Sequence, residues 1–469
     1  MASFAALAVV GDAAVAGLGL LALAALVTAY QRPYLLGPFV VLLLPAGERI
    51  HLLGAQVAPL EAVVGGGAIG YLAGLAMRRE GFRIRSADWT FAALLAFIAL
   101  SALGPVDNSD RVRELLFWGA LGTVFHTVST NLGNRRNLRL LLVALAVSTL
   151  VEASLALFEY VDSWSERLSL LDGAIVYPLP NGTLGHPNAL AQFLVLAVLA
   201  TLALALAEAG APRRFGFLAA GAGSLALIVT FSRASWIALA LGASVYLVER
   251  RTRVPVLVAG TVATVGAAAL ALLHTGAIGA RISSLFRDEA GELYDFRLEL
   301  IRRAARVAAE HPLTGSGHFE EVGVYAGRPD LATHPHNLFV GLAVFFGIPA
   351  AVAFAALVLL ALRAAWKGVR THAGAHRLTA VGFLALLVAF LVNGLLEYPF
   401  WNTSLTALIV LALAVAVTFD REAPESRTRR ALADPSGDET SDLLSSPALG
   451  SHFGKSLRRK TEGDRRMGA

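Results

Sequence analysis

The sequence predicts an all-α, polytopic integral membrane protein with about 12–13 transmembrane helices and one large extracytoplasmic loop. Hydrophobic residues make up 56% of the 469 positions and charged residues 16%. Soluble globular proteins average about 45–50% and about 25%. Apolar runs of spanning length recur along almost the whole chain, and arginine and lysine cluster in alternate loops. The first pattern indicates membrane-spanning helices, and the second indicates their orientation.

The apolar runs place the candidate spans. They lie near 5–29, 34–46, 57–77, 88–104, 114–131, 138–159, 187–208, 215–231, 235–249, 254–274, 337–362, 378–396 and 401–418. Several are shorter than the roughly twenty residues that a straight crossing needs, so we expect some broken helices.

The basic clusters predict the topology. The positive-inside rule assigns the loops with basic clusters to the cytoplasm. These clusters include Arg78, Arg79, Arg83 and Arg85; Arg135, Arg136 and Arg139; Arg213 and Arg214; Arg250, Arg251 and Arg253; and Arg363, Lys367, Arg370 and Arg377. The loops at 160–186, 275–336 and 396–401 are then extracytoplasmic. The net charge of +5 is mild and mostly belongs to this topology signal, so we expect no nucleic-acid partner.

Composition also separates two domains and excludes some chemistry. Residues 1–418 hold the spans and the loop at about 275–336, whereas 419–469 is polar and charged and predicts a disordered cytoplasmic tail. Cysteine is absent from the sequence, which excludes disulfides, thiolate metal sites and cysteine nucleophiles.

The loop 275–336 contains a predicted helix. Asp295 is a suitable cap for a helix from Phe296 to about Glu310. Pro312 ends the helical pattern, and the glycines that follow give a flexible turn.

A polar seam joins this loop to the next span. It reads Thr333-His334-Pro335-His336-Asn337, directly before the apolar run from Leu338. Polar groups at the edge of a hydrocarbon-spanning helix are costly, which favours a functional role. Histidine exchanges protons near neutral pH, so His336 and His334 are candidate catalytic bases. The alternatives are satisfied interfacial histidines and an Asn337 that simply caps the next helix.

Other candidates lie on the same side of the membrane. Arg233 stands between two apolar runs, Arg111 and Arg113 break the positive-inside pattern, and Glu397 occupies an otherwise apolar turn. Buried charges inside a membrane usually have partners or functions, so Arg111, Arg113 and Glu397 are candidate substrate-binding residues, and Glu397 is also a candidate partner for one of the arginines. The alternative for Arg233 is a side chain that snorkels to the interface.

Several short patterns occur in a fixed order along residues 30–418. They are Gly182-Thr183-Leu184-Gly185-His186-Pro187-Asn188, Thr230-Phe231-Ser232-Arg233-Ala234-Ser235-Trp236, Asp295-Phe296-Arg297, His311-Pro312-Leu313-Thr314-Gly315, His334-Pro335-His336-Asn337 and Glu397-Tyr398-Pro399-Phe400-Trp401. Together they resemble the O-antigen ligase and O-antigen polymerase superfamily of bacterial lipid-linked glycan transferases.

The resemblance implies glycan transfer from undecaprenyl diphosphate at the periplasmic face of the bacterial inner membrane. It implies that Arg233 and Arg297 bind the diphosphate and that His336, or His334, acts as base. It adds His186 and Asn188 as substrate-binding candidates, although both equally fit the start of a helix. The partners would be the lipid-linked glycan donor, a glycolipid or glycan acceptor, and membrane lipids.

The residue types agree with that chemistry. Guanidinium groups bind phosphate bidentately and keep their charge, and a neutral histidine removes a hydroxyl proton. The sequence has no nucleotide-binding glycine pattern and no Asp-x-Asp motif in a suitable loop. We therefore expect neither a nucleotide-sugar donor nor an obligatory metal, and no cofactor.

Three functions remain open from the sequence. The motifs favour a ligase acting on lipid A-core or a similar acceptor, and a polysaccharide polymerase shares its donor and chemistry. A transporter is the third, because embedded arginine and histidine also bind substrates and protons. Transporters commonly show internal repeats, which this sequence lacks.

Overall fold

The computed structural model describes residues 2–46, 50–52, 55–78, 84–104, 108–162, 179–258, 260–261, 289–319, 322 and 334–420. Contacts divide the chain into two units, Met1–Asp420 and Arg421–Ala469. All described residues belong to the first unit. The predicted disordered tail, most of the span 254–274 and parts of the loop 275–336 lie outside the described residues.

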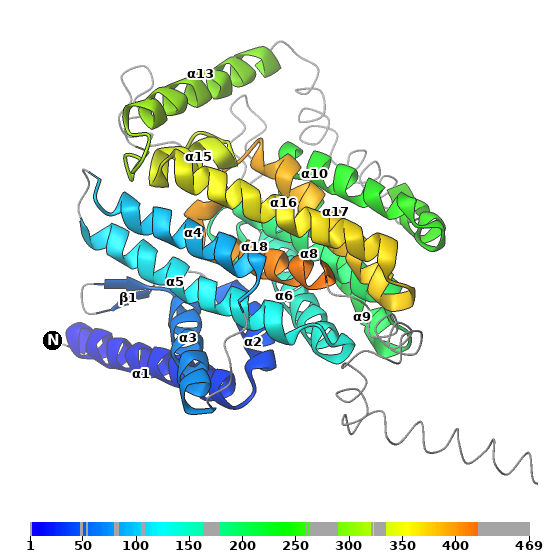
Figure 1. Ribbon diagram of the computed structural model, residues 1–469, viewed down its shortest axis with the longest axis horizontal. Helices are drawn as coiled ribbons and strands as arrows, with labels where there is room; N and C mark the ends of the chain where they lie inside the picture. Colours follow the sequence, from blue (N-terminus) through cyan, green and yellow to red (C-terminus); the bar gives the residue numbers. More distant parts are fainter. Residues whose placement is uncertain are drawn as a thin grey trace, which may run out of the picture. The chain divides into compact units, whose positions relative to one another are not determined.

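The first unit is helical, which confirms the predicted fold class (Figure 1). A short antiparallel hairpin, β1 (Ile50–Leu52) with β2 (Ala55–Val57), was not predicted. The helices are α1 (Ala2–Gln31), α2 (Leu36–Leu42), α3 (Pro59–Arg78), α4 (Ser86–Ser101), α5 (Asn108–Asn131), α6 (Arg135–Asp162), α8 (Pro187–Ala207), α9 (Ala211–Val229), α10 (Arg233–Ser244), α13 (Glu289–Glu310), α15 (Leu338–Phe346), α16 (Ile348–Thr371), α17 (Gly374–Gly394) and α18 (Thr403–Ala416).

Six of the described helices are long and apolar enough to cross a membrane. They are Pro59–Met77, Arg135–Asp162, Pro187–Ala207, Ile348–Thr371, Gly374–Gly394 and Thr403–Asp420. The predicted number of 12–13 also counts shorter apolar runs, and the structure has shorter apolar helices at Ala16–Gln31, Pro33–Leu42, Ser86–Ser101 and Arg233–Val248. The chain is therefore a multi-pass membrane protein.

The centre of the bundle is α8. In the apolar stretch of this helix, 94% of the residues are buried. A helix that is apolar on every side is typical of a fully enclosed position. It packs against α6, α9, α10 and α17. Small residues bring the neighbours close: a side chain at Gly242 of α10 would collide with Leu199 and with α17 at Ala385 and Ala389.

The predicted span 337–362 is two helices, α15 and α16, separated at Gly347. Gly347 has φ +92, and a Cβ there would lie 2.4 Å from the carbonyl oxygen of Leu313. The amide of Ile348 donates to the carbonyl of Pro312 at 2.8 Å. The end of the loop 275–336 thus packs into the helix break, and only glycine fits the close approach.

The loop helix α13 begins earlier than the sequence predicted. It starts at Glu289, so Asp295 lies inside it and the prediction that Asp295 caps it is wrong. Its apolar side, with Leu300, Ala304 and Val307, packs against Val344 of α15. Figure 1 shows α13 beside α15 at one end of the helices. This contact places Arg297, near the middle of α13, close to the polar seam.

Candidate functional site

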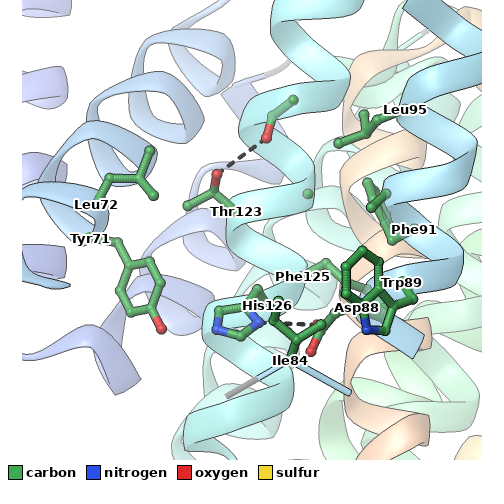
Figure 2. Close-up of a pocket in the computed structure, with 13 residues that line it drawn as sticks. Tyr71, Leu72, Ile84, Asp88, Trp89, Phe91, Leu95, Thr123, Phe125 and His126 are labelled. Carbon is green, nitrogen blue, oxygen red and sulfur yellow. Dashed lines mark hydrogen bonds and ion pairs between the residues drawn. The ribbon is translucent and has the colours of Figure 1, made fainter. Parts of the chain in front are cut away.

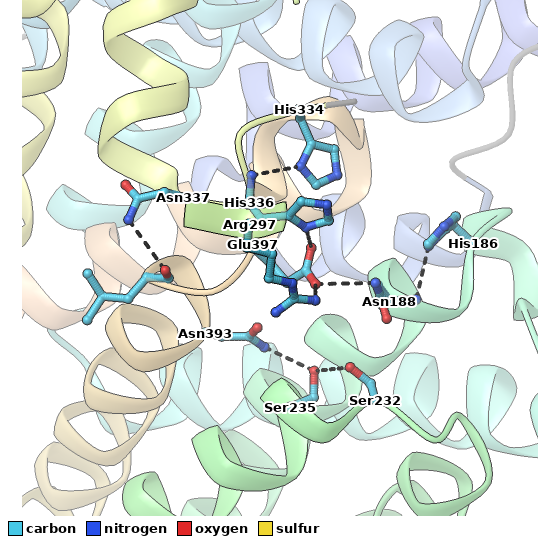
Figure 3. Close-up of polar contacts among 11 residues, drawn as sticks. His186, Asn188, Ser232, Ser235, Arg297, His334, His336, Asn337, Asn393 and Glu397 are labelled. Atoms are coloured by element: carbon cyan, nitrogen blue, oxygen red, sulfur yellow. Dashed lines mark hydrogen bonds and ion pairs between the residues drawn. The ribbon is translucent and has the colours of Figure 1, made fainter. Parts of the chain in front are cut away.

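The carboxylate of Glu397 joins three segments that are far apart in the sequence (Figure 3). Its Oε2 lies 2.9 Å from Nδ1 of His336. Its Oε1 accepts from Nη2 of Arg297 at 3.4 Å and from Nδ2 of Asn188 at 3.3 Å. Glu397 is 2% exposed. Burial opposes its ionisation, but the hydrogen bond to His336 and the nearby positive charge outweigh this effect and lower the pKa of the carboxyl.

The partners of His336 define its tautomer. A carboxylate only accepts hydrogen bonds, so Nδ1 of His336 carries the proton that Glu397 binds. Nε2 is then the ring nitrogen with a free lone pair. The backbone of His336 has φ +47, a left-handed conformation that costs about 1–3 kcal/mol and clusters at functional sites. The fold thus fixes this imidazole with Nε2 as its basic atom.

His334 has the opposite arrangement. Its Nδ1 accepts the backbone N–H of His336 at 3.3 Å, so a neutral ring carries its proton on Nε2. Burial, together with the nearby His336, lowers the pKa of His334 to about 4. Its ring stacks near Trp401, with centroids 6.3 Å apart. His334 therefore supports the seam and has no basic nitrogen left for a substrate in this arrangement.

Several helices begin around this site. His186 caps α8 by accepting from the amide of Asn188, and Asn337 caps α15 by accepting from Phe339 and Val340. Asn402 caps α18 and also donates to Leu184 at 3.2 Å. The candidates Asn337 and His186 thus have the capping roles that the sequence left as alternatives. Helix N-termini carry partial positive charge, which favours an anion near this end.

The segment before α10 is strained. Phe231 has φ +56, an unusual conformation for a bulky residue. Arg233 is the first residue of α10 and is partly buried. Two residues later, Ser235 accepts from Asn393 of α17 at 3.2 Å. Because Asn393 precedes Glu397 by four residues, this bond ties the start of α10 to the segment that carries the carboxylate (Figure 3).

Sequence reasoning missed two acidic residues of α6. The buried Glu152 accepts from the amide and the hydroxyl of Thr183, and Glu159 accepts from the amides of Asn181 and Gly182 at 2.7 and 3.0 Å. These bonds hold the turn that leads to His186 and Asn188. Glutamates at an i, i+7 spacing inside an apolar run were the available signal, because such charges need partners.

Two predicted arginines have other neighbours. Arg113 pairs with Glu61 of α3 at 2.8 Å. Arg111 is 5% exposed and its Nη1 lies 3.5 Å from the carbonyl of Thr314. Their predicted contact with substrate stays a prediction. In the structure, Arg113 connects α5 to α3, and Arg111 connects α5 to the end of the loop.

The cluster also resembles a set of metal ligands. Among the described residues, His334, His336 and Glu397 have ligand atoms within 4.8 Å of one another, and two histidines with a carboxylate suit zinc. However, the guanidinium of Arg297 already lies against the same carboxylate. A second cation would be repelled there, so the donor set fits an ion pair better than a metal centre.

The low pKa of His334 predicts how stability depends on pH. Above pH 6.5 the ring is neutral in both the folded and the unfolded chain and contributes nothing. As pH falls from 6.5 toward 4, His334 becomes protonated in the unfolded chain but stays neutral in the folded protein, so folding stability falls. In thermal unfolding of the purified protein, the His334→Gln variant should lose less stability than the unchanged protein as pH falls from 6.5 to 4. Equal slopes for the two proteins between pH 6.5 and 4 would contradict the burial of a neutral ring.

Comparison with known proteins gives one family. Residues 215–355 match the family model described as O-antigen ligase. A search of the curated proteins and a search of solved structures return no match. The matched segment runs from α9 into α16 and includes Arg233, Arg297 and both histidines of the seam. Residues 215–355 therefore form a segment similar to the O-antigen ligase family, which supports the resemblance that the motifs indicated and, broadly, a glycosyltransferase of the ligase or polymerase type.

Proposed function

We propose that this protein transfers a glycan from an undecaprenyl-diphosphate carrier to lipid A-core or a similar envelope acceptor, at the periplasmic face of the inner membrane. The observation that carries the proposal is the arrangement on Glu397. One carboxylate binds a histidine with a basic nitrogen and an arginine that fits a phosphate. A base and an anion-binding group side by side are what glycan transfer from a diphosphate requires.

In the proposed step, His336 is the general base. Its Nε2 takes the proton of the acceptor hydroxyl as that oxygen forms a bond to the anomeric carbon of the donor. The bond from the anomeric carbon to the diphosphate oxygen breaks, and the carrier diphosphate leaves with the electron pair. The imidazolium that forms is stabilised by Glu397, which already binds Nδ1–H at 2.9 Å.

The leaving diphosphate gains negative charge during this step. Arg297 is the proposed ligand, since its side chain is 33% exposed and reaches the site from α13. Arg233 is the second, because α10 begins beside the bonded pair Ser235 and Asn393. The N-termini of α8, α15 and α18 add partial positive charge. These groups stabilise the negative charge that develops in the transition state more than they stabilise the bound substrates.

The polymerase and transporter alternatives remain distinguishable by experiment. A polymerase would use the same donor site and a second carrier-linked glycan as acceptor. A transporter would need a substrate path through the bilayer, whereas the candidate residues gather at one end of the helices. This clustering favours an enzyme.

Transfer assays with two acceptors test the function. The full-length protein in lipid vesicles should move glycan from an undecaprenyl-diphosphate donor onto lipid A-core. Extension of carrier-linked glycan instead would identify a polymerase. Transfer to neither acceptor, from donors that a known ligase accepts, would contradict the proposed function.

Substitution of the proposed base should separate binding from turnover. We expect His336→Ala to bind the donor as the unchanged protein does and to lower kcat by about 10²–10⁴-fold, the usual contribution of a general base. His334→Ala is the matched control and should retain most of the activity. If His334→Ala abolishes transfer while His336→Ala keeps it, the two roles are reversed.

Substitution of the arginines should weaken the donor site. Arg297→Lys and Arg233→Lys keep the charge but lose the bidentate geometry, so each should lower donor affinity. Arg135→Lys is the control, because Arg135 pairs with Glu208 and is not among the candidate substrate-binding residues. Donor titration by calorimetry gives the affinities. Unchanged affinity in both the 297 and 233 variants would exclude these residues as the diphosphate ligands.

A further inference from the structure

A separate pocket lies between α3, α4 and α5 (Figure 2), and its lining shares no residue with the cluster around Glu397. Its cavity volume is about 210 Å³. At roughly 30 Å³ for a group of water size, this space holds about seven methylene groups. The lining is mostly apolar and includes Tyr71, Leu72, Phe91, Leu95 and Phe125. The pocket therefore fits part of a hydrocarbon chain.

The mouth of the pocket faces the membrane. Leu72, Ile84 and Trp89 line it and are 52%, 45% and 64% exposed. Large apolar side chains exposed on membrane-spanning helices contact lipid tails rather than water. A lipid chain can thus enter sideways from the bilayer without crossing an aqueous layer.

One end of the pocket is polar. Nδ1 of His126 lies 3.1 Å from Oδ1 of Asp88, and both side chains are at most 9% exposed. Asp88 also accepts the backbone N–H of Arg85 at 2.8 Å, and the Arg85 side chain donates to the carbonyl of Ser129. These bonds close the polar end and place a guanidinium beside it. A chain in the pocket would therefore have its headgroup at a basic margin.

The polar end belongs to the cytoplasmic leaflet. His126 follows Arg111 by fifteen residues on α5, which is about 22 Å along a helix. Arg111 contacts the end of the extracytoplasmic loop. Basic residues of the described segments lie at the opposite end of α5: Arg85 donates to Ser129 near the end of α5, and Arg135, Arg136 and Arg139 lie in the first turns of α6. This end is cytoplasmic by the positive-inside rule.

We propose that this pocket binds an anionic phospholipid of the cytoplasmic leaflet. One acyl chain occupies the space between α3, α4 and α5, and the headgroup phosphate lies at the basic margin near Arg85. The volume, the lateral mouth and the apolar lining select an acyl chain, and the arginines select a negative headgroup. This site is independent of the proposed glycan transfer.

The glycines of α5 allow the pocket to be filled. A Cβ at Gly119 would meet nothing within 4 Å, so Gly119→Leu extends into open space. A Cβ at Gly122 would lie 2.9 Å from Phe91, so that position is already packed. The matched control is Gly221→Leu on α9, where a Cβ also meets nothing within 4 Å. Ala92→Phe at the lining of the pocket is a second blocking variant.

Native mass spectrometry of the full-length protein, purified from phosphatidylglycerol and phosphatidylcholine mixtures, counts retained lipids. We expect the unchanged protein and Gly221→Leu to retain one phosphatidylglycerol, and Gly119→Leu and Ala92→Phe to lose it while keeping the same melting temperature. If Gly119→Leu misfolds, Ala92→Phe decides. Retention in both blocking variants would overturn the proposal, as would a retained phosphatidylcholine or polyprenyl phosphate in place of phosphatidylglycerol.

Fluorescence quenching locates the retained chain. Trp89 lines the mouth, and bromine on an acyl chain quenches tryptophan only at short range. The difference in quenching between the unchanged protein and the Trp89→Phe variant gives the contribution of Trp89. Brominated phosphatidylglycerol should reach half of this quenching at about a fivefold lower mole fraction than brominated phosphatidylcholine, and Gly119→Leu should remove that preference. Equal mole fractions for the two lipids in the unchanged protein would contradict an anionic headgroup site.

Discussion

The buried carboxylate of Glu397 is the interaction on which the candidate site depends. Removing such a charge from water costs several kcal/mol unless partners compensate. Here the partners come from three separate parts of the chain, namely His336 at the seam, Arg297 on α13 and Asn188 on α8. The cost of leaving the carboxylate unpaired therefore holds these three parts together. It also explains why the loop helix α13 is found against the bundle.

Charge at this end of the helices is arranged for an anion. Glu397 offsets part of the charge of Arg297, and Arg233 and the helix N-termini add further positive potential. Helices α8, α15 and α18 all begin here with a side-chain cap. A diphosphate, the proposed substrate group, would meet fixed dipoles there that need no reorganisation.

Sequence alone predicted the class of protein and the segments that contribute to the site, because apolar periodicity and ordered motifs are local. It predicted that Glu397 pairs with one of the arginines, which the contact with Arg297 confirms, but it did not predict the other partners. Glu61 binds Arg113 from 52 positions away, and Glu152 binds the backbone of a turn 31 positions later. Because nearly every residue has a backbone N–H, the sequence does not show which of these groups binds a carboxylate. The start of α13 was also misplaced, because aspartate favours a cap position by residue type, whereas the helix begins six residues before Asp295.

The segment that matches the family does not contain the residue that organises the site. Residues 215–355 carry the arginines and histidines, while Glu397 and the turn at 181–183 lie on either side of it. A chimaera exchanged at the boundaries of the match would separate His336 and Arg297 from their own carboxylate, because Glu397, Asn188 and α6 would all come from the other parent. The transplantable unit extends from α6 through the cap of α18 at Asn402. The segment that is similar to the family model is thus shorter than the segment whose residues contact one another at the site.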